Sequence, residues 1–207
     1  MLPDRDTALR LLREAERLNP GPWVGHSLFV ASAAQAVAAH HPDLEPERAY
    51  ILGSLHDIGR RTGPNGDRHI LDGYDFLLET GFPDAARIAL THSFPIQDIE
   101  MLQGAWDGTP QELERLRALL QGVQYTLEDR LFQLCDALAL PGGYCVLEER
   151  LVDVALRYGM SARTLEKWRA FLEIKADFEQ TLGRSVYSLL PGFTTRFSSD
   201  SGPSQSS

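Results

Sequence analysis

The stretch Leu55-His56-Asp57-Ile58-Gly59-Arg60 decides how this chain is interpreted, because it places a histidine and an aspartate side by side. A neutral imidazole and an ionised carboxylate are ligands that suit Fe, Mn, Zn, Co or Ni. Sequence neighbours rarely serve one ion unless a helix is ending there, and Gly59 is placed to end that helix. The pair therefore predicts a metal site at the C-terminal end of a helix.

Further candidate ligands lie at wide spacings around this pair. They are His26, His69, His92 and Asp136. Asp136 lies among leucines, where an unpaired carboxylate would be costly, so it needs a cation, strong hydrogen bonds or a raised pKa. Each histidine taken alone could instead be a hydrogen-bonded core residue or a residue that stabilises a helix end. Only the complete set predicts one site.

Apolar residues recur at helical spacing along the chain, which predicts an all-α fold. Gly122 to Tyr125 is the single stretch that could form a strand. In the last helix the expected core stripe is Leu165, Trp168, Phe171, Leu172, Phe178 and Leu182. The predicted helices span about 8–18, 23–40, 46–57, 69–80, 83–93, 112–120, 127–140, 146–158 and 161–182.

The composition indicates one ordinary globular domain, which we place at residues 1–190 with a motif-bearing core at about 22–140. Residues 191–207 end in a run of Ser, Gly, Pro, Asp and Gln that cannot bury a core, so we expect a disordered tail. A net charge of −9 argues against binding of a nucleic acid polymer. Two cysteines without a Cys-x-x-Cys spacing, and no leader or membrane-length apolar run, favour a cytoplasmic protein without a membrane partner.

A segment rich in turn residues follows the His-Asp pair. Residues 60–68 contain Gly63-Pro64-Asn65-Gly66, which predicts a mobile loop beside the ligands. The loop carries Arg60, Arg61 and Arg68, and arginine is suited to forked recognition of phosphate. We predict that these three residues bind substrate, the alternative being that they are solvated surface charges.

In this order and helical context, the six residues resemble the HD superfamily of metal-dependent phosphohydrolases. Residues 55–59 look like the HDIG form of its signature, Trp23-Val24-Gly25-His26-Ser27 resembles its first-histidine helix, and residues 68–74 resemble its histidine-plus-glycine helix. The resemblance spans about Pro22 to Leu140. It implies an HD-domain helical bundle with the site in its middle, here followed by additional C-terminal helices.

The resemblance also implies how the ligands are divided. One ion would be held by His26, His56, Asp57 and Asp136, and a second by His69 and His92, with Asp57 bridging the two. We therefore expect two divalent metal ions (Fe, Mn, Zn, Co, Ni or Mg) and catalytic roles for Asp57, His69 and His92. Two such cations lower the pKa of a water and aim the hydroxide at phosphorus, so no protein nucleophile is required.

These features predict a metal-dependent phosphohydrolase that cleaves a phosphate ester or anhydride of a nucleotide or another small phosphorylated metabolite. Ser93-Phe94-Pro95-Ile96 stands where cyclic-di-GMP phosphodiesterases have a Gly-Tyr-Pro motif, and Arg60 stands where many members have lysine. The ligand set is more similar to that of symmetrical dinucleoside tetraphosphate hydrolases. The alternatives are a mixed-valence di-iron oxygenase, which uses the same six ligand types, and a non-catalytic ligand-sensing module.

Overall fold

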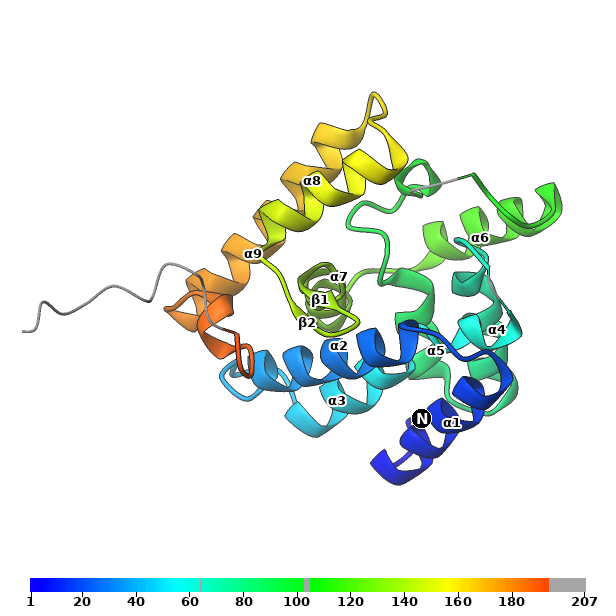
Figure 1. Ribbon diagram of the computed structural model, residues 1–207, viewed down its shortest axis with the longest axis horizontal. Helices are drawn as coiled ribbons and strands as arrows, with labels where there is room; N and C mark the ends of the chain where they lie inside the picture. Colours follow the sequence, from blue (N-terminus) through cyan, green and yellow to red (C-terminus); the bar gives the residue numbers. More distant parts are fainter. Residues whose placement is uncertain (64, 103–104, 194–207) are drawn as a thin grey trace, which may run out of the picture.

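The computed structural model describes residues 1–63, 65–102 and 105–193, and within them it confirms the all-α class (Figure 1). The helices are α1 (Arg5–Leu18), α2 (Trp23–Ala38), α3 (Pro46–Leu55), α4 (His69–Glu79), α5 (Pro83–Thr91), α6 (Pro110–Gly122), α7 (Leu127–Leu138), α8 (Leu147–Tyr158) and α9 (Thr164–Leu182). Short 3₁₀ helices are η1 (Ile58–Thr62), η2 (Ile99–Met101) and η3 (Val186–Leu189). Most of the predicted tail, residues 194–207, lies outside the described residues. No helix in the described ranges is long and apolar enough to cross a membrane.

The alanine-rich helix α2 lies at the centre of the bundle, against α3 and α7 (Figure 1). Several of its small side chains are fully buried, as at Ala31 and Ala34. A Cβ atom at Gly53 of α3 would lie 2.7 Å from the Cα atom of Ala31, so the two helices approach to backbone contact. One cluster of buried side chains extends from Ala8 in α1 to Leu190 after η3, so elements from both ends of the chain share a core.

Helix α3 begins as the sequence indicates but ends earlier than Gly59. The Glu45 carboxylate accepts hydrogen bonds from two backbone N–H groups of the first turn, and Pro46 occupies the start of the helix. The helix ends at Leu55, His56 is its C-cap, and the chain continues into η1. The prediction that Gly59 ends the helix is therefore wrong.

Gly59 is instead the point where η1 touches α4. A Cβ atom at Gly59 would lie 2.0 Å from the His69 carbonyl oxygen and 2.4 Å from the backbone nitrogen of Gly73. Atoms at such distances overlap, and the backbone on the far side cannot rotate away as a side chain would. A residue without a side chain is therefore needed here to bring Asp57 close to His69.

Two other local predictions are corrected by the structure. Residues 122–125 form no strand, because Gly122 still belongs to α6 and the described residues beside Val123 to Tyr125 offer no pairing partner. A small antiparallel hairpin forms instead from β1 (Ala139–Leu140) and β2 (Gly143–Tyr144). Arg60 and Arg61 lie in η1 rather than in a loop.

The buried stripe of α9 also differs from the expected one. It consists of Lys167, Phe171, Ile174 and Phe178, which recur at intervals of four, three and four residues. Leu165 and Leu172 are exposed, at 56% and 40%. The apolar composition of α9 identifies it as a core helix. The buried face could not be identified from the apolar pattern, because it includes a lysine.

A buried carboxylate fastens α5 to α7 and so fixes where His92 lies. Asp129 of α7 is fully buried and accepts hydrogen bonds from the Thr91 hydroxyl (2.7 Å), the Thr126 hydroxyl (2.8 Å) and the Arg87 guanidinium. Burial alone would raise the pKa of Asp129, but the bonds from Arg87, Thr126 and Thr91 hold it below its usual value.

We expect Asp129→Asn to lower the free energy of unfolding by about 2 kcal/mol at neutral pH, because it weakens charge-assisted hydrogen bonds. A carboxyl whose pKa is lowered by folding stabilises above its unfolded pKa of about 3.9 and loses this effect as the pH falls further. The difference between variant and wild type should therefore shrink below about pH 4. Urea denaturation at neutral pH and below about pH 4 measures this difference in the free energy of unfolding. The control is Asp153→Asn, which breaks an exposed ion pair.

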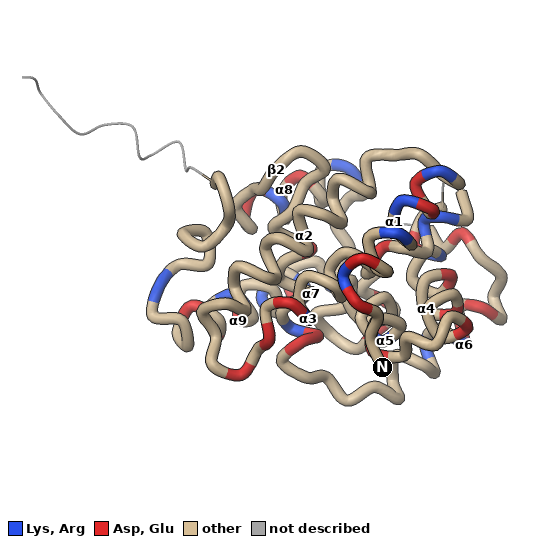
Figure 2. Tube along the Cα trace, turned by 90° about the horizontal axis from the view of Figure 1, so that it is seen from below, with Lys and Arg blue, Asp and Glu red and all other residues tan. Residues whose placement is uncertain are grey.

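Charged residues cover the outside of the bundle. Figure 2 shows acidic and basic residues interspersed near α1, and acidic residues near α4 and α6. Arg115 of α6 forms a forked ion pair with Asp75 of α4, at 2.6 and 2.5 Å. This ion pair connects α6 to α4, but an exposed pair of this kind contributes little to the free energy of unfolding.

Candidate metal centre

Helix ends and helix starts bring the six candidate ligands together in the middle of the bundle. His26 lies in the first turn of α2, His56 and Asp57 follow α3, His69 opens α4, His92 follows α5, and Asp136 lies in the last turn of α7. The sequence separates these residues by up to 110 positions, yet His26 Nε2 lies 2.8 Å from Asp136 Oδ1. The fold therefore brings together the six candidate ligands that the sequence indicated.

Asp57 is at the centre of the arrangement. Its Oδ1 atom lies 3.0 Å from Nε2 of His69, 3.6 Å from Nε2 of His92 and 3.9 Å from Nε2 of His56. All four side chains are buried. Three imidazole nitrogens and a carboxylate oxygen that converge in a buried space are the donor set of a transition-metal site.

The same hydrogen bond orients three of the histidines. In each, Nδ1 lies beside the carbonyl oxygen three residues earlier: His56 beside Gly53 (2.7 Å), His69 beside Gly66 (2.6 Å) and His92 beside Ala89 (2.9 Å). A carbonyl only accepts, so Nδ1 carries the proton and, in the neutral ring, Nε2 keeps a free lone pair. This is the arrangement that supports metal-bound histidine.

The Nε2 atom of His56 is a buried polar atom without a hydrogen-bond partner among the described residues. Such an atom is costly to bury, because it loses hydrogen bonds to water and forms none in their place. A metal ion at this point would satisfy it. The donor chemistry at His56 therefore fits a metal ligand better than a structural histidine.

The ligands can form two groups that share Asp57. Ligand atoms of His26, His56 and Asp57 lie within 4.8 Å of one another, as do those of Asp57, His69 and His92. Asp136 belongs to neither group, but its Oδ1 atom contacts His26 at 2.8 Å and lies 3.5 Å from His56 Nε2. Asp136 therefore adjoins the first group through these two histidines. The chain offers places for divalent ions, and the number of ions stays a prediction.

Arg60 is a cation that contacts two of these ligands. Its Nε atom donates to Asp57 Oδ2 at 2.7 Å, and Nη2 lies 3.5 Å from His69 Nε2. Burial would raise the pKa of Asp57, but Arg60 and His69 hold it well below its usual range. Burial and the neighbouring His56 lower the pKa of His92 to about 3. Asp57 is thus ionised and His92 neutral at pH 7, as metal binding requires.

The other two arginines expected to bind substrate point elsewhere. The guanidinium carbon of Arg61 lies 4.1 Å from the centre of the Phe76 ring. Arg68 lies between Asp72 and Glu112, at 3.5 and 3.1 Å. In the described part of the chain, the contacts of Arg61 and Arg68 are therefore with Phe76, Asp72 and Glu112 and not with the six candidate ligands. A role in substrate binding stays a prediction that the geometry supports for Arg60 alone.

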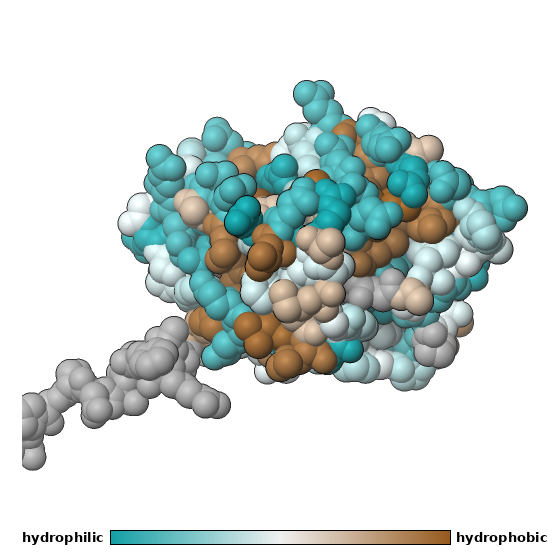
Figure 3. All heavy atoms as spheres, turned by 90° about the horizontal axis from the view of Figure 1, so that it is seen from above, coloured by the Kyte–Doolittle hydropathy of each residue, from teal (hydrophilic) through white to brown (hydrophobic). Residues whose placement is uncertain are grey.

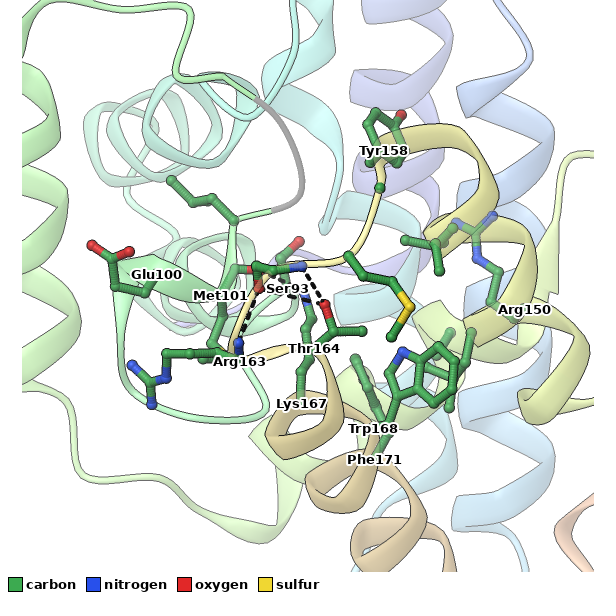
Figure 4. A pocket seen from close by; sticks show the side chains of 18 of the residues that line it. Ser93, Glu100, Met101, Arg150, Tyr158, Arg163, Thr164, Lys167, Trp168 and Phe171 are labelled. Atoms are coloured by element: carbon green, nitrogen blue, oxygen red, sulfur yellow. Dashed lines mark hydrogen bonds between the residues drawn. The ribbon is translucent and has the colours of Figure 1, made fainter.

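Sequence reasoning missed a cavity of about 240 Å³ beside the ligands (Figure 4). Asp136 and Ser93, which directly follows His92, line one side, and residues of α8 and α9 line the other. Lys167 and Trp168 of α9 belong to this wall. One signal was present in the sequence, because Lys167 shares helical spacing with Phe171 and Phe178 on the buried face.

The HD domain family model matches residues 23–140. The matched stretch contains all six candidate ligands and ends before α8 and α9. Comparisons with curated proteins and with solved structures gave no match.

Proposed function

This chain belongs to the HD domain family, and on that premise we propose that it is a metal-dependent phosphohydrolase. Its substrate would be a phosphate ester or anhydride of a nucleotide or another small phosphorylated metabolite. The observation that carries the proposal is the buried, unpartnered Nε2 atom of His56, which faces the same carboxylate as the Nε2 atoms of His69 and His92. A bound cation would satisfy these imidazole lone pairs and the carboxylate together.

The roles of the residues follow from their positions. His26, His56 and Asp57 would hold one ion and Asp57, His69 and His92 a second, with Asp136 completing the first group. The ions would lower the pKa of an attacking water and neutralise the charge of the phosphoryl oxygens. Arg60 already lies beside Asp57, so its guanidinium is placed to bind a phosphoryl oxygen and to orient the substrate.

Neither cysteine is suited to act as the nucleophile. Burial raises the pKa of the Cys135 thiol, and it raises the pKa of Cys145 to about 11. Both thiols are therefore protonated near neutral pH, whereas nucleophilic cysteines need a lowered pKa. This agrees with attack by water rather than by a protein group.

The proposal is tested by metal analysis of the purified chain together with phosphate release from a panel of phosphate monoesters, diesters and nucleotides. We expect bound divalent metal and release of phosphate, abolished by a chelator and restored by adding back the metal. Metal binding without phosphate release from any compound would contradict the hydrolase and favour a sensing module. Iron-dependent oxygen consumption would instead identify an oxygenase, because hydrolysis consumes no oxygen.

A further inference from the structure

The cavity beside the candidate metal centre has one wall made of elements outside the matched family region. Asp136 and Ser93 line its inner end, next to the ligands, and α8 and α9 line its outer part. Figure 4 shows Lys167 reaching from α9 toward Ser93 and Met101, with Trp168 and Phe171 below. A molecule bound here would contact the centre at one end and the C-terminal helices at the other.

The outer part of the cavity combines charged side chains with an apolar and aromatic wall. It is lined by Leu151, Val154, Met160, Trp168 and Phe171. Figure 3 shows apolar side chains gathered in patches on the face at the top of Figure 1, where α8 and α9 lie. Ligand pockets combine such walls with a few polar groups that fix orientation. The wall therefore suits a flat, largely apolar group.

Lys167 is the polar group that differs from its neighbours. It is 9% exposed, and its Nζ atom donates to the Met101 carbonyl. Two other cations line the cavity, but Arg163 pairs with Asp98 and Glu166, and Arg150 lies 3.6 Å from Asp153. Among the described residues Lys167 forms no ion pair with a carboxylate.

Burying an ammonium without an ion-pair partner costs free energy. An anion that binds beside the ammonium offsets part of that cost. Burial lowers the pKa of Lys167 to about 8, although Asp67 and Asp136 oppose this effect. The group is therefore still mostly charged at neutral pH. An ammonium has three donors and Met101 takes one, which leaves donors for a ligand.

Resting on the proposed function, we propose that this cavity selects phosphate monoesters whose alcohol part is a single flat ring system. The ring would lie against Trp168 and Phe171, and Lys167 would bind the phosphate between the cavity and the centre. A volume of about 240 Å³ lies below the usual range of pockets for drug-sized ligands, which is about 300–1,000 Å³. A cavity of this volume suits a single ring system.

The test compares hydrolysis of 1-naphthyl phosphate with that of glycerol 2-phosphate by the purified full chain. We expect kcat/KM to be at least about tenfold higher for the naphthyl ester, since aromatic stacking supplies about that much preference and the better leaving group adds to it. Trp168→Leu keeps an apolar side chain but removes the flat ring, so it should lower kcat/KM for the naphthyl ester about tenfold and leave that of glycerol 2-phosphate unchanged. Lys167→Gln should raise KM for both esters by about tenfold or more, since it removes a charge-assisted hydrogen bond.

The matched control is Lys175→Gln. Lys175 lies on the same helix two turns later, is bonded to Glu179 and does not line the cavity. Its replacement should leave both kinetic constants unchanged. Circular dichroism of each variant shows whether it is folded.

Binding is measured separately by calorimetry with 1-naphthyl phosphate in the presence of EDTA, where no turnover occurs. We expect Lys167→Gln and Trp168→Leu each to weaken binding about tenfold, and Lys175→Gln not to. Unchanged hydrolysis of 1-naphthyl phosphate by Trp168→Leu would overturn the pocket and leave the proposed hydrolase standing. Binding that depends on Lys167 and Trp168, without hydrolysis of any ester, would support the pocket and contradict the proposed hydrolase.

Discussion

If the proposed function is right, the His56→Ala variant should lose bound metal, and its rate of phosphate release should fall by more than about 100-fold. About 100-fold is the upper limit for residues that merely support a ligand, and His56 is expected to be a ligand itself. Its Nε2 atom is buried and has no hydrogen-bond partner in the part of the chain that the structure describes, and its Nδ1 atom is bonded to the Gly53 carbonyl. Metal content by mass spectrometry and kcat under saturating metal measure the two losses.

The control for this variant is His40→Ala, which removes an exposed histidine at the end of α2. It should keep both metal and activity. If His56→Ala retains its metal and its activity while remaining folded, the six-residue centre is wrong. If it loses both but only because it unfolds, His92→Ala supplies the same comparison from a different helix.

Gly59→Ala should be among the most destabilising single substitutions in this chain, with a loss of about 3 kcal/mol or more in the free energy of unfolding. The added methyl group would lie 2.0 Å from the His69 carbonyl oxygen, so η1 and α4 must separate. That separation would move Asp57 away from His69. Urea denaturation measures the stability, and metal analysis of the folded fraction measures the effect on the centre.

Gly122→Ala is the matched control, because a Cβ atom at Gly122 meets nothing within 4 Å. It lies in the last turn of α6, where alanine is the better helix former, so it should leave stability equal or up to about 1 kcal/mol higher. A Gly59→Ala protein as stable as the Gly122→Ala protein would contradict the close contact between η1 and α4.

The helical architecture could be predicted because it depends on local pattern. The α2 helix starts at Trp23 and α3 starts at Pro46, both as expected from the residues there. The buried face of α9 could not be predicted in the same way. Which face of a helix is buried depends on its neighbours, and the buried face of α9 includes Lys167, which the expected apolar stripe left out.

The candidate ligands could be nominated from sequence, but their surroundings could not. Spacing and helix ends indicated His56, Asp57 and Asp136, whereas the Nδ1 hydrogen bonds to carbonyl oxygens appear only in three dimensions. The neighbouring arginines show the same limit. Arg60 and Arg61 are adjacent in sequence, yet one contacts Asp57 and the other stacks on Phe76.

The family match ends at residue 140, and the wall formed by α8 and α9 contains none of the six candidate ligands. Under the proposed function, this division has an evolutionary consequence. Substitutions in residues 147–182 can reshape the cavity while the ligands on the earlier helices stay in place. The chain can therefore acquire a new substrate by small steps without passing through forms that have lost their metal.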